Sequence, residues 1–356
     1  MMGLAGITHE AVNVFDVEAD LKHYHEMLHE ALDDKSLNPD SASWGPIHGD
    51  LLQVPLDALE PCDGLVSGPP CTPWANNGKR LGSADPRAAV FERIVEWVEH
   101  LALQGMWFFL LENSTNIAAK ISKEEVPFAL KIKSRLEARL HDWVIDLSRS
   151  SLESFLPVRR SRCWLRGMRR DMLPMSQSIP APLTRIGTGP VALEHLLDPC
   201  IENCRIEAMT TTKQRDNTAF RIKEIFAMVE ANPSHHHRIA VFDPHRAPEK
   251  KWKSPVHYDV VPVLRTMGPP YFVISLWDLD KPTHEKAFFR FLTVGERYVL
   301  QGHRAEYSSF AKTPRHALKM TGNAYAVPML TAVLAPMLEV TGQSFAANTN
   351  VKKRRM

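Results

Sequence analysis

The sequence is poor in cysteine and has no excess of charge of either sign. The cysteine count is odd and the spacing is not that of a disulfide framework, which favours a reducing compartment; the five are Cys62, Cys71, Cys163, Cys200 and Cys204. The formal net charge is only +2, from 43 Lys and Arg against 41 Asp and Glu. Any contact with nucleic acid must therefore come from local basic patches, because the protein as a whole is not basic.

Long apolar runs are also missing. No stretch approaches the length needed to span a membrane and no secretory signal is visible, so we expect no membrane partner. The clearest basic patch is the tail Lys352-Lys353-Arg354-Arg355. It could contact phosphate or act as a nuclear address, or it could be a solvated, disordered end.

A second pair of cysteines, as in a four-cysteine zinc site, is absent. Cys200 and Cys204 have a permissible Cys-x3-Cys spacing, with His195 and the run His235-His236-His237 nearby in the sequence. Without the second pair, we expect these to be surface or loop residues, and we predict no metal site.

Apolar periodicity alternates between strand and helix over the first 150 residues. The expected strands are 11–16, 47–52, 62–67, 106–111 and 143–147, and the expected helices are 18–32, 88–103 and 123–140. Alternation of this kind predicts an α/β fold with a doubly wound, mostly parallel sheet.

The alternation fails after about residue 167. Residues 168–218 hold many Pro, Thr, Met and Arg residues without a sustained period. Beyond them the pattern indicates a helix over 220–229 and strands over 240–242 and 271–276. Helical pattern returns near residue 294 and ends with 325–338. The sequence thus predicts a second, smaller and less regular lobe.

Two of the predicted strands end in residues capable of chemistry. Gly64-Leu65-Val66 leads into Ser67-Gly68-Pro69-Pro70-Cys71, which predicts a buried strand that delivers one thiol into a rigid loop. The apolar run from Met106 to Leu111 ends in Glu112. If the two strands are neighbours, a nucleophile and an acid meet at the sheet edge where open α/β sheets carry their sites.

Gly-Pro-Pro-Cys71 with Glu112-Asn113 after the next strand resembles the cytosine-C5 methyltransferases. Four further segments, in family order, support this resemblance over about residues 11 to 335. The segment from Pro157 to Arg162 is similar to the family's Pro-Gln-x-Arg-x-Arg. The segment from Arg290 to Gly302 is similar to its Arg-x-Leu-Thr…Glu…Leu-Gln-Gly. Gly322-Asn323-Ala324 looks like the family's last motif, and Gly49-Asp50 fits its cofactor-side acid.

The resemblance implies that Cys71, Glu112, Arg160 and Arg162 are catalytic. Cytosine C5 accepts a methyl group once a thiolate has added to C6, which is covalent catalysis by an activated nucleophile. Cys71 then needs a lowered pKa, for which Arg160 and Arg162 are candidates. By resemblance the two arginines also hold the base and its phosphate, Glu112 bonds the N3 edge of the base, and Asn113 fixes the Glu112 loop.

The implied methyl donor is S-adenosylmethionine. Asp16 could accept hydrogen bonds from the ribose, as acids at strand ends do in nucleotide-binding sheets, or it could be an ordinary helix N-cap. The positions that match the family's cofactor site are Asp16, Val17, Asp50, Leu51, Val90, Asn323 and Ala324.

The resemblance also implies an organisation and a partner. Residues 1–167 would form a Rossmann-like catalytic domain, 168–289 a target-recognition region, 290–340 a return to the catalytic domain, and 341–356 a disordered basic tail. The expected substrate is double-stranded DNA whose target base is flipped out, acted on by a monomer. We expect it in the nucleus of a eukaryote, or otherwise in the cytoplasm at the nucleoid.

The sequence departs from the family pattern in places. The family opens with a strand and a Phe-x-Gly-x-Gly loop, whereas this chain begins Met1-Met2-Gly3-Leu4-Ala5-Gly6, so we expect the first strand and part of the cofactor site to be missing. Thr72-Pro73-Trp74-Ala75 stands where Gln-x-Phe-Ser is usual, and Val158 replaces Gln. An inactive remnant is therefore one alternative. A tRNA methyltransferase is another, although that branch's Cys-Phe-Thr signature is missing.

Overall fold

The computed structural model describes most of the chain from residue 50 onward. Its gaps there are 76–78, 122–124, 174–177, 188, 205, 207–208, 210, 247–254, 265, 267–269, 278, 283–284, 312 and 354–356. Before residue 50 it describes only β1 (Glu10–Ala11), β2 (Val14–Phe15), β3 (Ser43–Trp44) and β4 (Ile47–His48), besides residue 50 itself. The predicted helix over 18–32, together with Asp16 and Val17, lies outside the described residues.

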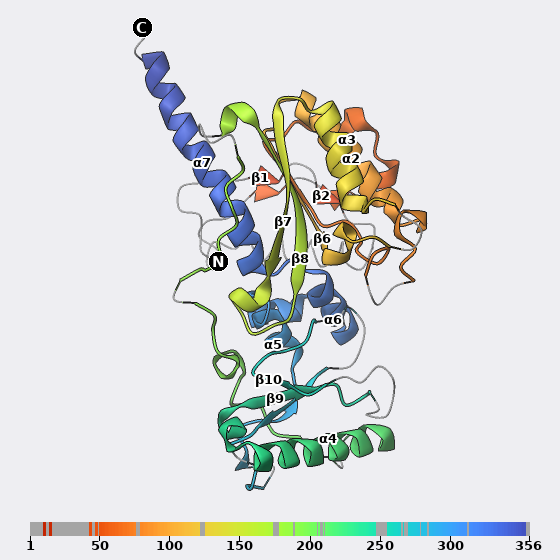
Figure 1. Ribbon diagram of the computed structural model, residues 1–356, viewed down its shortest axis with the longest axis vertical. Helices are drawn as coiled ribbons and strands as arrows, with labels where there is room; N and C mark the ends of the chain where they lie inside the picture. Colours follow the sequence, from red (N-terminus) through yellow and green to blue (C-terminus); the bar gives the residue numbers. More distant parts are fainter. Residues whose placement is uncertain are drawn as a thin grey trace. The chain divides into compact units, whose positions relative to one another are not determined.

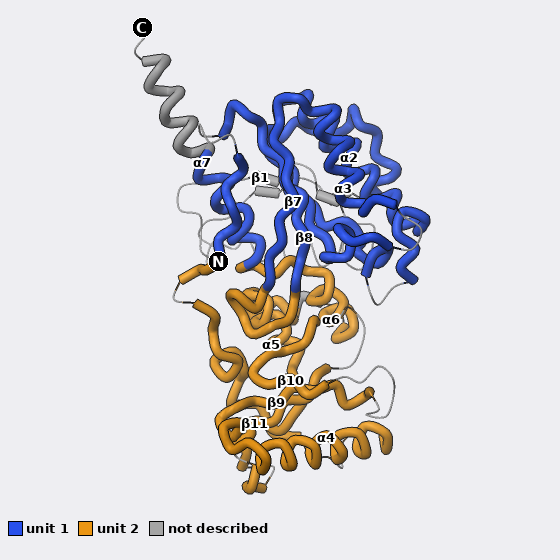
Figure 2. The backbone as a smooth tube through the Cα atoms, in the orientation of Figure 1, with its two compact units in different colours: residues 1–151, 161–184, 329–356 blue, residues 152–160, 185–328 orange. Residues whose placement is uncertain are grey.

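The chain divides into two compact units, coloured separately in Figure 2. Unit 1 comprises residues 1–151, 161–184 and 329–356, and unit 2 comprises residues 152–160 and 185–328. This division rests on contacts within each unit. The functional boundaries near residues 167, 289 and 340 stay a prediction.

Unit 1 is built on a mixed sheet with the strand order β5-β6-β8-β7. The strands are β5 (Gly64–Ser67), β6 (Phe108–Ser114), β7 (Trp143–Ser151) and β8 (Ser161–Arg169). β5 and β6 are parallel, whereas β8 is antiparallel to both β6 and β7. Only residues 152–160 connect β7 to β8, and a parallel crossover needs a dozen residues or more, so the chain returns antiparallel. The predicted α/β, Rossmann-like class is confirmed, with a sheet of mixed direction.

The paired short strands at the start of the chain follow the predicted direction. β1 pairs in parallel with β3, and β2 pairs in parallel with β4. β2 and β4 lie within the expected strands 11–16 and 47–52, β1 begins one residue before the first of them, and β3 was not expected.

Helices cover the unit 1 sheet, as Figure 1 shows. α2 (Ala88–Leu103) has the predicted bounds, while α3 (Phe128–Arg139) begins later than expected. Pro127 explains the late start, because a residue before proline is disfavoured in the helical region. The apolar stripes of both helices share one core with β6, β7 and β8, which includes Phe91, Val95, Phe109, Ile132 and Ile145. α7 (Val327–Lys353) contributes Met337 to a separate cluster with Trp107, Phe108 and Met168.

Unit 2 contains an antiparallel sheet with the order β10-β9-β11-β12. Its strands are β9 (Ile239–Phe242), β10 (His257–Tyr258), β11 (Phe272–Ser275) and β12 (Phe289–Phe291). α4 (Thr212–Ala231) packs on it through Ile225 and Val229, and begins at a capping box formed by Thr211 and Gln214. α5 (Val294–Val299) and α6 (Pro314–Asn323) follow β12. The predicted helix and two strands of the lobe are therefore present, with α4 longer than expected.

One described segment passes a length-and-composition test for a membrane span, which the sequence reading did not anticipate. It runs from Pro314 to Val340. The segment is not one continuous helix, because α6 ends at Asn323, Ala324 has extended backbone, and α7 begins at Val327. The core helix of a soluble protein passes the same test, and 39% of the segment's most apolar stretch is buried.

Candidate active site

The Cys71 loop lies next to the end of β6, in unit 1. The parallel register pairs Ser67 with Leu111, so the chain leaves β5 beside Glu112. The Asn113 side chain is 1% exposed, and its Nδ2 donates to the carbonyl of Pro69 at 3.0 Å. Asn113, which was expected to fix the Glu112 loop, thus also holds the loop that carries the thiol.

A second amide holds the far side of the same loop. Asn116 Nδ2 donates to the Trp74 carbonyl at 3.1 Å. Between the two anchors, the backbone amides of Trp74 and Ala75 donate to the Cys71 carbonyl at 3.0 and 2.9 Å. Asn116 was not among the predicted residues, although its position three residues after Asn113 was visible in the sequence.

Trp74 stands at the Phe position of the family's usual Gln-x-Phe-Ser. Its side chain is fully buried and packs against Phe91 of α2 and Phe128 of α3, with ring centroids at 5.9 and 4.7 Å. An aromatic ring buried in this way anchors the loop in the core through apolar area and ring packing. The aromatic position of this segment is therefore well packed, whereas Thr72 is exposed.

Glu112 and Arg162 form an ion pair. Glu112 pairs with Trp164 across β6 and β8, and Ser114 pairs with Arg162, so Glu112 and Arg162 are diagonal neighbours on one face. Arg162 Nε contacts Glu112 Oε1, and the two side chains are only 14% and 13% exposed. Arg162 was expected to act on Cys71 and the base; the structure joins it to the predicted acid.

Arg87 is a cation near Cys71 that the sequence reading missed. It directly precedes α2, and its Nε and Nη2 donate to Asp85 at 2.9 and 2.7 Å. These hydrogen bonds lower the pKa of Asp85 to about 2. The pKa of Arg87 is raised, chiefly by Asp85 and to a smaller extent by the charge of Cys71. The sequence feature that could have indicated Arg87 is the spacing of an acid and a base in Asp85-Pro86-Arg87, directly before a helix with a regular apolar stripe.

Two other thiols are poorly suited to be nucleophiles. Burial raises the pKa of Cys163 to about 11, and it also raises the pKa of Cys62. A thiol with a raised pKa holds little thiolate near neutral pH, and thiolate is the reactive form. All five cysteines are free thiols.

Arg160 belongs to unit 2, and its guanidinium is engaged by main-chain carbonyls. The side chain is 3% exposed, and Nη1 and Nη2 donate to Gly322 and Ala324 at 3.2 and 2.7 Å. Gly322 has no room for a side chain, since a Cβ atom there would lie 2.3 Å from the amide nitrogen of Thr266. The predicted motifs around Arg160 and around Asn323 are therefore in direct contact.

The described residues of the predicted cofactor site lie in both units. In unit 1, Asp50 caps the short 3-10 helix Leu51–Gln53, and its Oδ1 accepts from the Leu52 amide at 3.0 Å. Leu51 and Val90 are partly buried against the core. In unit 2, Asn323 is exposed and Ala324 partly buried. Asp50 is only partly buried, so its carboxylate is accessible to a ligand, and Leu51 and Val90 supply apolar contact area.

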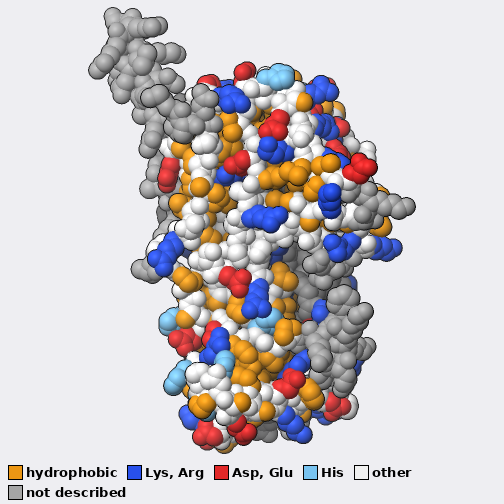
Figure 3. Space-filling view, in the orientation of Figure 1, with side chains coloured by type: hydrophobic (Ala, Val, Ile, Leu, Met, Phe, Trp, Pro, Cys, Tyr) orange, Lys and Arg blue, Asp and Glu red, His pale blue; other side chains and the backbone are white. Residues whose placement is uncertain are grey.

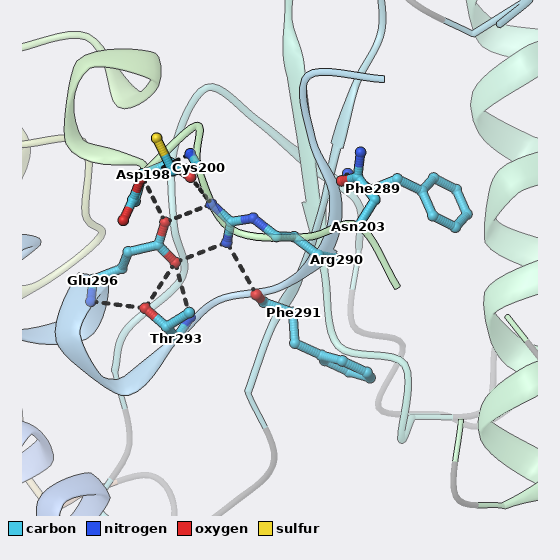
Figure 4. A network of polar contacts seen from close by, with 8 residues as sticks. All are labelled: Asp198, Cys200, Asn203, Phe289, Arg290, Phe291, Thr293 and Glu296. Atoms are coloured by element: carbon cyan, nitrogen blue, oxygen red, sulfur yellow. Dashed lines mark hydrogen bonds and ion pairs between the residues drawn. The ribbon is translucent and has the colours of Figure 1, made fainter. Parts of the chain in front are cut away.

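The Arg-Phe-Leu-Thr…Glu segment forms a buried polar network in unit 2, shown in Figure 4. Arg290 and Glu296 are 2% and 4% exposed, with Nη2 and Oε1 at 2.7 Å. Glu296 also accepts from the amides of Thr293 and Asp198, while Arg290 donates to the Asp198 carbonyl. This network ties a loop near residue 198 to the start of α5, which is a structural task.

Charge on the surface agrees with the small net charge. On the face drawn in Figure 3, basic and acidic side chains are interspersed among the described residues. Within the described part of the chain, no three His, Cys, Asp or Glu residues gather in a way that could hold a metal ion.

Comparison with known proteins gives the family. The model of the C-5 cytosine-specific DNA methylases matches residues 41–339, and the chain belongs to this family. It is 25% identical over 138 residues to the type II methyltransferase M.FnuDI of Fusobacterium nucleatum, which is 39% of this chain and 38% of that protein. It is 26% identical over 156 residues to M1.ScrFI of Lactococcus lactis subsp. cremoris, which is 42% of this chain and 38% of that protein. The matches thus span well under half of each curated relative.

Solved structures support the fold. A protein from an E. coli prophage, described as a DNA modification methyltransferase, superposes with a TM-score of 0.55 at 16% identity, covering 93% of this chain and 92% of that chain. A variant of DNMT2 from Spodoptera frugiperda gives a TM-score of 0.52 at 12% identity, covering 92% of both chains. At these identities the likeness concerns the fold alone.

Proposed function

We propose that this protein transfers a methyl group from S-adenosylmethionine to C5 of cytosine in DNA, through a covalent adduct of Cys71. The observation that carries the proposal is the link between the two strand ends. The Asn113 amide binds the Pro69 carbonyl, so the loop with the thiol is fastened to the segment with the Glu112 carboxylate. Membership of the cytosine methylase family gives this arrangement its chemical meaning.

The residues divide the reaction between them. The Cys71 Sγ thiolate adds to C6, and Glu112 holds the N3 edge of the base while charge develops there. The electron pair this places on C5 takes the methyl group, the C5 proton then leaves to a base, and expulsion of Sγ restores the thiolate. Arg162 keeps Glu112 oriented, and Arg87 contributes positive charge near Cys71.

The partly exposed Asp50, Leu51 and Val90 fit a nucleoside-bearing ligand, because they combine one carboxylate with apolar area. Asp50 would accept a hydrogen bond on the adenine side, and Leu51 and Val90 would pack against the ring. Asn323 and Ala324 are the other described positions that we propose for cofactor binding. S-adenosylmethionine supplies the electrophilic sulfonium methyl that is transferred.

The proposed substrate form is double-stranded DNA. A C5 inside a stacked duplex cannot reach a thiol held in a loop, so the target base must be flipped out. We assign sequence reading to residues 168–289, and propose that the protein acts as a monomer without a membrane partner. Its proposed location is the nucleus in a eukaryote, or the cytoplasm at the nucleoid in a bacterium.

A trapping experiment tests the proposal. With S-adenosylmethionine present, duplexes carrying 5-fluorocytosine should form a covalent complex, because fluorine cannot leave as a proton. Cys71→Ser should abolish trapping and retain DNA binding, whereas Cys200→Ser, which removes an exposed thiol, should trap like the unmodified protein. Complexes are resolved on denaturing gels.

Two outcomes would contradict the proposal. Trapping that persists in Cys71→Ser would exclude Cys71 as the nucleophile. Trapping and methyl transfer on 5-fluorocytosine tRNA, with none on duplex or single-stranded DNA, would replace the DNA substrate by RNA.

A further inference from the structure

Side chains from elsewhere in unit 2 hold the turn over residues 321–325, which comprises the end of α6 and the two residues after it. Gln301 Nε2 donates to the Thr321 carbonyl at 2.5 Å, and Arg160 donates to the carbonyls of Gly322 and Ala324. His303 Nε2 lies 2.9 Å from the Tyr325 carbonyl. Four of the five carbonyls from residue 321 to residue 325 therefore have a side-chain partner, and the one between them belongs to Asn323.

This arrangement answers a general need of helix ends. The last four carbonyls of a helix have no partner within the helix, and a cation near that end is favoured by the helix dipole. Here the Met320 carbonyl accepts from the Ala324 amide, and Gln301 and Arg160 satisfy the next two. The helix ends without a left-handed glycine cap, because side chains from elsewhere in unit 2 take its place.

The three donors are well held themselves. Gln301 is fully buried and Arg160 is 3% exposed. The main-chain carbonyl of Gln301 in turn accepts from the Val327 amide at 2.9 Å. Gln301 therefore bonds residues on both sides of Asn323, Thr321 through its side chain and Val327 through its main chain. Burial and the charge of Arg160 lower the pKa of His303 below its usual value, so the ring is neutral at pH 7 and one nitrogen can donate to Tyr325. Asn323 itself is exposed.

We propose that Arg160, Gln301 and His303 are positioning residues that fix the turn over residues 321–325 and present the Asn323 side chain to the methyl donor. The assignment rests on the proposed function. It gives Arg160 a task other than contact with the target base or its phosphate. Two residues further along the chain, Arg162 is paired with Glu112, so the two arginines of this short motif have different partners.

Binding measurements on isosteric variants test the assignment. Arg160→Met, Gln301→Met and His303→Phe should each weaken S-adenosylmethionine binding by about tenfold, the order expected for losing a hydrogen bond to a buried group. The dissociation constant for duplex DNA should change less than about twofold in the same variants. Arg159→Met is the matched control, because the neighbouring arginine is exposed and pairs with Glu153, and it should leave cofactor affinity unchanged.

A double-mutant cycle distinguishes a positioning role from a separate contact. If Arg160 acts through Asn323, then Arg160→Met and Asn323→Ala combined should cost no more than the larger single loss. Additive losses would overturn the assignment. So would an Arg160→Met protein that binds the cofactor normally and has lost DNA affinity, since that result restores Arg160 to the nucleic acid.

Hydrogen exchange on the free protein separates this proposal from the proposed function. Exchange of the Ala324 and Val327 amides should quicken in the three variants and stay unchanged in Arg159→Met. If exchange quickens in the three variants but the unmodified protein binds no S-adenosylmethionine, the proposed function is refuted. Unchanged exchange in all three variants would refute the positioning role, whatever the cofactor affinity.

Discussion

The Glu112 carboxylate forms an ion pair with the Arg162 guanidinium in the protein alone. In the proposed reaction it also bonds the N3 edge of the base. The diagonal pairing across β6 and β8 places the carboxylate beside Arg162, and the ion pair through Oε1 holds it there. A carboxylate held in advance needs little reorganisation when charge develops on the base. This preorganisation is the main catalytic contribution we assign to Arg162.

Replacing Glu112 by Gln should therefore reduce turnover far more than cofactor binding. The amide keeps the shape but loses the charge, and we expect kcat to fall about a hundredfold, the usual scale for one such transition-state interaction. The KM for S-adenosylmethionine should stay within about threefold in the same assay. Tritiated methyl transfer measures both. A parallel loss of cofactor affinity would show that Glu112 is structural.

At this scale the sequence predicted candidate reacting groups but not their partners in the structure. Cys71 and Glu112 stand out because each follows an apolar run, a pattern that can be read along one segment. The Glu112–Arg162 pair depends on the register of two antiparallel strands about fifty residues apart, which no local pattern encodes. Arg160 was expected at the base, and its contact with the residue 322–324 turn likewise requires the tertiary structure.

Among the elements, those with strong periodicity were the ones predicted well. The apolar stripe of α2 is regular, and its predicted and observed bounds agree. β8 was not predicted as a strand because charged residues interrupt its run. One of them, Arg166, is 2% exposed, and it donates to Asp146 at 2.8 and 2.5 Å and to the Pro180 carbonyl. A buried arginine whose hydrogen bonds are satisfied can lie inside a strand. In the sequence, however, a charged residue indicates an exposed position.

The network around α5 allows a stability prediction at the scale of one element. Arg290→Met leaves Glu296 buried without its cation, and we expect a loss of about 3–5 kcal/mol in the free energy of unfolding. Urea unfolding followed by circular dichroism measures it. Lys133→Met, which removes a more exposed ion pair with Glu137 on α3, should cost less than about 1 kcal/mol. Equal losses in the two variants would mean that the Arg290 network contributes nothing special.

For the whole molecule, the chain passes between its two units several times. Residues 152–160 and 185–328 make one unit, so α5, α6 and the turn with Asn323 share it with the antiparallel sheet. The sequence predicted a separate irregular lobe, because its periodicity failed after residue 167. It did not predict that the family's last motifs would pack within the same compact unit, since short helices carry little signal about their long-range partners.

The exchange of the lobe is the test at this scale. If residues 168–289 read the DNA sequence, replacing them with the lobe of a family member of known target should move the methylated site, because base-edge contacts specify and phosphate contacts position. Bisulfite sequencing of a methylated random-sequence duplex pool reports the change. An unaltered site preference would place recognition outside these residues.

The structure also indicates which boundaries the exchanged segment should have. The Asp198 backbone is bonded to Arg290 and Glu296, and Asn203 is bonded to the backbone of Lys286 and Phe289. Exchanging all of 168–289 separates Asp198 from Arg290 and Glu296, whereas exchanging 212–285 leaves Asp198, Asn203 and all the partners just named, Lys286 included, in the original chain. We expect the narrower exchange to yield a more stable protein than the wider one, by at least the 1–3 kcal/mol that about one unmet buried hydrogen-bonding group costs. Urea midpoints of the two chimeras decide this, and a wider exchange that is equally stable would show that the Asp198 loop is supported by other contacts.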